Sequence, residues 1–330
     1  RLHGSLAIVQ DQVGQNKEAI QSQRDAIALR MELVRANPKV PDYSYDLGLS
    51  YYNLTTSLPS HPIKDKKGNP ECLTLFEQSI DAYTNALRAV PNSPKYKNGL
   101  AFVHTSYARE LRRDFQDYIK AEEQLLKAKE FFESLEKTNS MTPQFRLNRI
   151  EYEKEWGQLE IVRKEYAQAK TRYENAIAQL EILIKEGFQL HTSRYEIARI
   201  YTSLGYISQE RCEFDEMLKL VNQRVDLLEV LLQERPGDMD ITSSLQKARQ
   251  DKFGLTLFAL DKLFPKPVEP TPENLIVHYE GRLQRWKGWI KEFPKVTQYR
   301  KDASEECYHL ATQYARSCKP DARLPADQQE

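Results

Sequence analysis

Small and apolar residues recur along the chain at intervals of three and four, the spacing that places side chains on one face of an α-helix. In the stretch "EYAQAKTRYENAIAQLE", residues 165–181, this spacing joins Ala169, Tyr173 and Ala176. The same spacing returns in five other places: Ala19/Gln23/Ala26, Ser79/Tyr83/Ala86, Ala121/Leu125/Ala128, Met217/Val221/Arg224 and Leu275/Tyr279/Arg282. Successive triads begin 60, 42, 48, 48 and 58 residues apart, which indicates a repeated helical unit.

The two longest intervals contain proline-rich stretches. Residues 57–70 lie in "SLPSHPIKDKKGNPE", which has three prolines and a run of charges and is typical of an inserted loop. Residues 264–273 lie in "FPKPVEPTPEN", whose four prolines favour an extended linker over a helix. Without these stretches the period is close to the 42 to 48 residues seen elsewhere. The sequence does not show whether the two stretches have a function.

A second helical pattern precedes each triad. "YDLGLSYYNL" (45–54) and "YEIARIYTSL" (195–204) share a tyrosine, an acid, an aliphatic residue and a small residue at matching offsets. Small residues on one helix allow a second helix to approach closely. Pro38, Pro91, Pro236 and Pro294 follow predicted helix ends, where proline stops a helix from continuing. The predicted unit is therefore helix, turn, helix.

These motifs resemble the tetratricopeptide repeat (TPR), which places Leu-Gly/Ala and Tyr on its first helix and Ala-x3-Tyr/Phe-x2-Ala on its second. The stretch 13–38, "VGQNKEAIQSQRDAIALRMELVRANP", is similar to the lengthened repeats found beside bacterial Ser/Thr protein kinases, particularly planctomycete-type ones. The resemblance covers roughly residues 1–315. It departs from the family pattern at Gln23, Arg224 and Arg282 and in its long period.

The resemblance implies an all-α, right-handed superhelical solenoid of about six helix-turn-helix repeats, in which each repeat buries its apolar face against the next. We expect a repeat array over residues 1–263, the proline-rich linker at 264–273, a terminal helical hairpin at 274–318 and a disordered tail at 319–330. Trp286 and Trp289 lie three residues apart on the terminal hairpin. We expect them to pack on the preceding repeat, with an exposed docking patch as the alternative.

Charge and composition add few candidate activities. Lys plus Arg and Asp plus Glu are balanced at 48 each, so no basic surface for nucleic acid is indicated. The sequence has no apolar run of the roughly 20 residues that span a bilayer and no signal peptide. Because the chain begins at Arg1, we expect a fragment, and we assign it to the cytoplasm.

No motif for catalysis or cofactor binding is found. Glycine-rich phosphate loops, the kinase motifs HRD and DFG, and the hydrolase motifs GxSxG and HExxH are all absent. Cys307, His309 and Cys318 are the best metal candidates, but the first two are only two positions apart and face different sides of a helix. We therefore predict no metal, no cofactor and no enzymatic activity within this chain.

We predict a protein-interaction scaffold that presents a concave groove to a peptide or a partner protein. In the family, first-helix side chains beside the packed positions line this groove, and aromatic and Arg side chains dominate such interfaces. Carried over by spacing, the candidate partner-binding residues are Tyr45, Tyr52, Asn53, Asn98, Phe102, Tyr195 and Arg199. An aromatic residue at helical spacing also fits the core between repeats.

Two other functions remain open: an accessory region of a bacterial Ser/Thr kinase, and a regulatory module that senses a ligand. The sequence also leaves self-association and the identity of the partner open.

Overall fold

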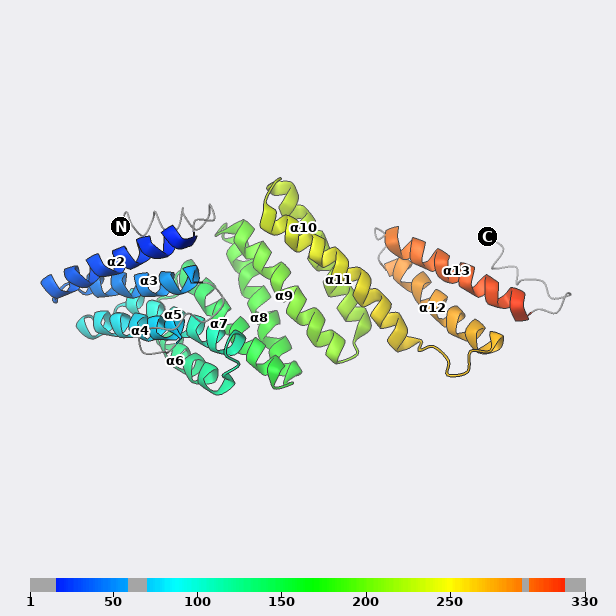
Figure 1. Cartoon of the computed structure of the whole chain (residues 1–330), viewed down its shortest axis with the longest axis horizontal. Coiled ribbons are helices and arrows are strands. Elements are labelled where there is room, and N and C mark those ends of the chain that lie inside the picture. The colour runs from blue at the N-terminus through cyan, green and yellow to red at the C-terminus, as the bar shows by residue number, and fades with distance from the viewer. Residues whose placement is uncertain (1–15, 59–69, 293–296, 318–330) are drawn as a thin grey trace. The chain divides into compact units, whose positions relative to one another are not determined.

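The computed structural model describes residues 16–58, 70–292 and 297–317, and every regular element in these ranges is an α-helix. The helices are α2 (Asn16–Ala36), α3 (Pro41–Ser57), α4 (Glu71–Ala89), α5 (Pro94–Arg113), α6 (Tyr118–Lys137), α7 (Pro143–Val162), α8 (Tyr166–Lys185), α9 (Leu190–Glu210), α10 (Phe214–Glu234), α11 (Met239–Leu263), α12 (Pro272–Glu292) and α13 (Thr297–Ser317). Figure 1 shows them joined mostly by short turns. The predicted all-α fold of consecutively packed helices is confirmed.

The chain forms two compact units, Arg1–Ile207 and Ser208–Glu330. In the first unit, neighbouring helices pack as α2 on α3, α3 on α4, α5 on α6 and α7 on α8. In the second unit, α10 packs on α11 and α12 on α13. The predicted boundaries at 263, 273 and 318 stay predictions. Most of the predicted 57–70 loop and the whole predicted tail lie outside the described residues.

The triads read from the sequence occupy every second helix, from α2 to α12. In the first five triads every residue is buried, and Tyr83 and Tyr173 are each only 1% exposed. Tyr83 and the Ala121/Leu125/Ala128 triad belong to one core of the first unit, which also includes Leu100 and Phe132. The spacing that predicted a helix face therefore marks the side of each second helix that packs inward.

One turn recurs with a fixed period. Gln116, Lys164 and Cys212 each have a positive φ, of 53°, 61° and 59°, and each follows the previous one by 48 residues. One residue later the backbone N–H donates back to the preceding helix, as Asp117 does to Leu111 and Glu165 to Glu160. The left-handed conformation turns the chain so that this N–H reaches a carbonyl group left unpaired at the end of the helix. The same turn therefore joins the two helices at each of these positions.

Prolines and polar caps set the helix boundaries. Pro41, Pro94 and Pro143 occupy the first turn of α3, α5 and α7, where a missing N–H costs nothing. Ser93 and Thr142 accept hydrogen bonds from the backbone N–H three residues later. Helices α2, α4 and α10 end two residues before Pro38, Pro91 and Pro236, as predicted. Pro294 lies outside the described residues.

The second unit is organised around two tryptophans on α12. Trp286 and Trp289 are 0% and 1% exposed, and their rings meet edge to face at 5.4 Å. They share a core with Phe214 and Met217 of α10, Leu260 of α11 and Leu310 of α13. The Trp289 indole N–H donates to Asp215 at 3.2 Å. The expectation that both pack inward is confirmed, and they form no exposed patch.

The proline-rich stretch is anchored to α12 at its first residues. His278 Nδ1 lies 3.2 Å from the Pro265 carbonyl oxygen. A Cβ atom added to Gly281 would lie 2.5 Å from the Phe264 ring, so this contact requires a glycine. Gly288, seven residues further along α12, has open space at the same position.

This pair of glycines allows a test with an internal control. Gly281→Ala should destabilise the second unit by about 1–3 kcal/mol, because the Phe264 ring must move. Gly288→Ala should stabilise it by roughly 0.5–1 kcal/mol, because alanine favours helix. Urea unfolding is followed by tryptophan fluorescence in a Trp156→Phe background, where the two remaining tryptophans lie in the second unit. Equal effects of the two substitutions would contradict the Phe264 contact.

One buried polar pair in the first unit is sensitive to pH. His104 of α5 is 5% exposed, and its Nδ1 lies 2.8 Å from Gln124 Oε1 of α6. Burial lowers the pKa of His104 to about 4, although the Gln124 bond opposes this shift. The imidazole is therefore neutral in the folded protein at pH values where an unfolded histidine already carries a proton.

The His104 contribution to stability should be complete above pH 6.5 and should be lost as the pH falls toward 4, because the unfolded chain binds the proton first. When the pH is lowered from 7 to 4.5, the free energy of unfolding should fall by about 2–3 kcal/mol less in His104→Gln than in the wild type. Urea unfolding monitored by circular dichroism at both pH values measures the difference. Parallel pH dependences of the two proteins would exclude this role.

Candidate partner-binding surface

The candidate residues lie on α3, α5 and α9, three alternating helices of the first unit, and α7 is the first helix of the repeat between α5 and α9. Helix α3 contacts α5, and α5 contacts α7. Hydrogen bonds join α7 to α9, including one from Gln158 Nε2 to Ser203 Oγ at 3.0 Å. We call the residues through which these helices meet the first-helix surface: Tyr45, Tyr52, Asn98, Phe102, Arg109, Glu151, Lys154, Glu155, Glu196 and Arg199.

Aromatic side chains gather at the α3–α5 end of this surface. Tyr52 and Phe102 are both half-buried and meet edge to face, with ring centroids 4.9 Å apart. The ring centroid of Tyr45 lies 5.0 Å from that of Tyr83 and 5.5 Å from that of Tyr96. The Lys95 ammonium lies over the Tyr45 ring, 4.2 Å from its centroid. Tyr52 and Phe102 thus form one aromatic pair, and both Tyr45 and Tyr52 also pack against the core.

The polar candidates differ in exposure. Asn98 is only 7% exposed, and its Oδ1 accepts from Asn148 Nδ2 of α7 at 3.2 Å. This bond holds two neighbouring helices together, which leaves Asn98 little surface for a partner. Asn53 is half-buried beside Tyr52, and its carbonyl oxygen accepts from Thr56 at 2.8 Å.

Charged side chains continue the surface across α5 and α7. Glu155 is 7% exposed and accepts from Arg109 Nε at 2.6 Å and from Arg112 at 3.0 Å. Arg109 also donates to Glu151 at 2.8 Å. Lys154 joins Glu151, at 2.6 Å, to Glu196 of α9. Cations and carboxylates therefore alternate from α5 to α9.

The electrostatics of this network favour full ionisation. Burial lowers the pKa of Arg109, but the carboxylates of Glu155 and Glu151 outweigh it and raise the pKa above its usual range. Burial raises the pKa of Glu151, yet the Lys154 and Arg109 cations dominate and hold it below its usual value. Charged partners of this kind are costly to leave unpaired in a partly buried site.

Arg199 and Tyr195 lie at the α9 end of the surface. The Arg199 side chain is 58% exposed and pairs with Glu196 at 2.9 Å. Tyr195, one turn earlier, is half-buried. Helical spacing in the sequence identified Arg199 but not Arg109, Glu151, Lys154, Glu155 and Glu196. Arg109 was within reach of the pattern, since it continues the line of Asn98, Phe102 and Thr105 at spacings of three and four.

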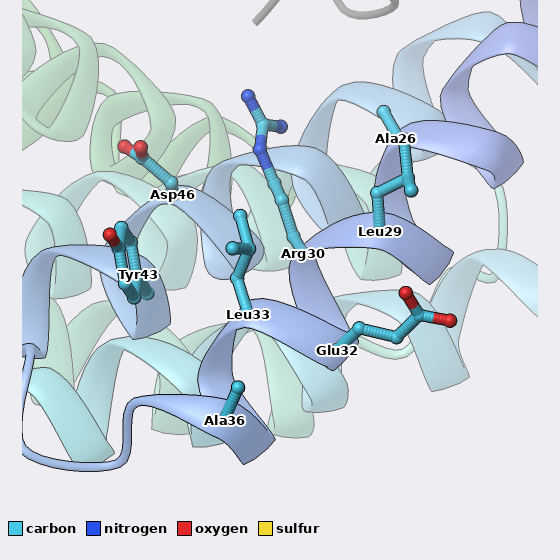
Figure 2. Close-up of a pocket in the computed structure, with 8 residues that line it drawn as sticks. All are labelled: Ala26, Leu29, Arg30, Glu32, Leu33, Ala36, Tyr43 and Asp46. Atoms are coloured by element: carbon cyan, nitrogen blue, oxygen red, sulfur yellow. The ribbon is translucent and has the colours of Figure 1, made fainter.

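A pocket with a volume of about 580 Å³ lies between α2 and α3, apart from the first-helix surface. Figure 2 shows Leu33 and Arg30 of α2 opposite Tyr43 and Asp46 of α3. The Arg30 guanidinium donates to the Ser50 hydroxyl. Leu29 and Leu33 are 49% and 44% exposed, so this end of the unit presents apolar surface. No sequence pattern had singled it out.

The described residues contain no group of three His, Cys, Asp or Glu side chains that could hold a metal ion. No described helix combines enough length with enough apolarity to cross a bilayer.

No protein-family model and no curated protein matches the chain. Among solved structures, BtubC from P. vanneervenii shares 14% identity over 94% of this chain and 96% of its own, with a TM-score of 0.49. The apo form of RapI shares 14% identity over 94% and 98% of the two chains, with a TM-score of 0.46. Human IFIT1 with m7Gppp-AAAA shares 14% over 93% and 68%, with a TM-score of 0.40.

These neighbours are TPR-like helical repeat proteins. At such identities and TM-scores the likeness has no bearing on what this chain binds. None of them connects the chain to a kinase.

The contribution of the charged network to the stability of the first unit can be measured by a substitution at Glu155. Glu155→Gln should lower the free energy of unfolding by about 2 kcal/mol, because two partly buried guanidinium groups lose the charged acceptor that they share. Glu122→Gln is the matched control, since Glu122 pairs with Arg163 at the surface and should cost less than about 1 kcal/mol. Urea unfolding by circular dichroism gives both values. Equal costs would show that the network contributes no more than a surface pair.

Proposed function

We propose that the chain is a non-catalytic scaffold that binds a peptide or partner protein through the first-helix surface. The observation that carries this proposal is the continuity of that surface, in which hydrogen bonds, ion pairs and ring contacts join side chains of four helices. Such side chains are ordered before a partner arrives, which lowers the entropic cost of binding. Within this proposal, Tyr52, Phe102 and Arg199 are the anchors.

The anchors combine the two chemistries that dominate protein interfaces. Tyr52 and Phe102 offer an aromatic pair that is only half-buried, and Arg199 offers an exposed guanidinium. A suitable partner is an extended segment with an apolar side chain at one end and a carboxylate at the other. The proposed role beside a kinase rests on the sequence resemblance alone and stays a prediction.

Selection of a random-peptide library against the full chain tests this function. Selected peptides should bind the Tyr52→Ala/Arg199→Ala variant at least tenfold more weakly, because it loses an aromatic anchor and a charge. Leu126→Ala/Lys129→Ala, which removes one apolar and one basic side chain from α6, should change affinity less than about twofold. Isothermal titration calorimetry measures each affinity. If both variants bind equally well, the first-helix surface is not the binding site.

A further inference from the structure

A pocket of about 780 Å³ lies between α7 and α8. It includes Glu153, Trp156 and Glu160 of α7 and Gln168, Arg172, Asn175 and Gln179 of α8. Glu153, Trp156 and Glu160 are spaced by three and four and lie about 200° around α7 from Glu151, Glu155 and Gln158. The pocket is therefore on the opposite side of α7 from the first-helix surface.

Glu160 lines this pocket, and one of its carboxylate oxygens has no hydrogen-bond donor among the residues that the structure describes. Glu160 is 5% exposed, and its Oε1 accepts from Arg172 Nε at 2.7 Å. Its second oxygen, Oε2, is buried and accepts no hydrogen bond. A buried carboxylate oxygen without a donor is costly, so the site favours any group that can donate to it.

The two arginines that line the pocket already have carboxylate partners. Arg172 donates to Glu153 at 2.6 Å as well as to Glu160, and its guanidinium lies 5.3 Å from the Trp156 ring. Arg163 pairs with Glu122 of α6 at 2.9 Å. Burial raises the pKa of Glu160, and although Arg172 opposes this shift, the carboxylates of Glu165 and Glu153 add to it. A further positive charge next to Glu160 would offset both the desolvation of its carboxylate and the repulsion from Glu165 and Glu153.

The wall provided by α8 suits a polypeptide ligand. Gln168, Asn175 and Gln179 are exposed and lie on one face of α8. Their amide groups can both donate to and accept from the backbone of an extended peptide. The half-buried Trp156 supplies an aromatic surface for an aliphatic stem or a cation.

We propose that this pocket binds a lysine side chain of an extended segment of a partner protein, with the ammonium donating to Glu160 Oε2. A single free oxygen suits the compact ammonium group better than the two-pronged guanidinium of arginine. The amides of α8 hold the backbone on either side of the lysine. This site is independent of the first-helix surface, so the Tyr52→Ala/Arg199→Ala variant retains it.

The probe is the peptide acetyl-Gly-Gly-Lys-Gly-Gly-amide, and the readout is the ¹H–¹⁵N indole signal of Trp156, assigned by its absence in Trp156→Phe. The lysine peptide should shift this signal saturably. The norleucine analogue, which lacks the charge, and n-butylamine, which lacks the backbone, should each bind at least tenfold more weakly. The proposal is overturned if either matches the peptide, or if the peptide gives no saturable shift up to about 20 mM, since millimolar affinity would be visible there.

Two variants and a matched control locate the site. Glu160→Gln should weaken the lysine peptide at least tenfold, and circular dichroism verifies that it folds. Gln168→Lys changes only an exposed side chain at the pocket and should also weaken the peptide tenfold, because its own ammonium competes for Glu160. Ala167→Lys adds the same charge about 100° away on α8 and should leave binding unchanged. Equal effects of the two lysine substitutions would mean that general charge repulsion, not occupancy of the pocket, governs binding.

Discussion

The fold of the first unit depends on an aromatic ring of one helix lying directly against the backbone of its neighbour. A Cβ atom at Gly48 would lie 3.1 Å from the Tyr83 ring, and one at Gly157 would lie 3.0 Å from Tyr173. Both tyrosines are almost completely buried. A single helical hairpin could not cover these rings, so each hairpin is stable only when the next one packs on it.

This constraint explains why so much of the fold could be predicted. Glycine or alanine on one helix and a ring flanked by small residues on the next are sequence patterns, and they gave the helices from α2 to α10 and their inward faces. The two tryptophans of α12 were also predicted correctly, because their spacing placed both on one face. The division of the chain after Ile207 had no such signal, since α9 runs through it as one helix that contains no proline, and Gly205 does not interrupt it.

The site was predicted less completely, and the reason is physical. Helical spacing identifies which residues share a face, and it placed Tyr52 and Phe102 on neighbouring first helices. It does not give the rotation of one helix against another, which decides that Asn98 bonds to Asn148 and that Arg109 reaches Glu151 and Glu155. Long charged side chains are also ambiguous in sequence, because Glu160 with one unpartnered oxygen and a fully solvated glutamate look the same.

The recurring left-handed turns have a consequence for how this chain can change in length. Because Gln116, Lys164 and Cys212 occupy the same conformation 48 residues apart, the chain passes through equivalent geometry at each of them. An insertion or deletion of one whole period between two such residues keeps a helix end joined to the turn that it requires. A change of any other length must be accommodated in a loop between helices, as the longer interval that contains residues 57–70 already is. The equivalent turns therefore allow the array to lengthen or shorten by whole hairpins. Smaller changes in length fall in the loops between helices.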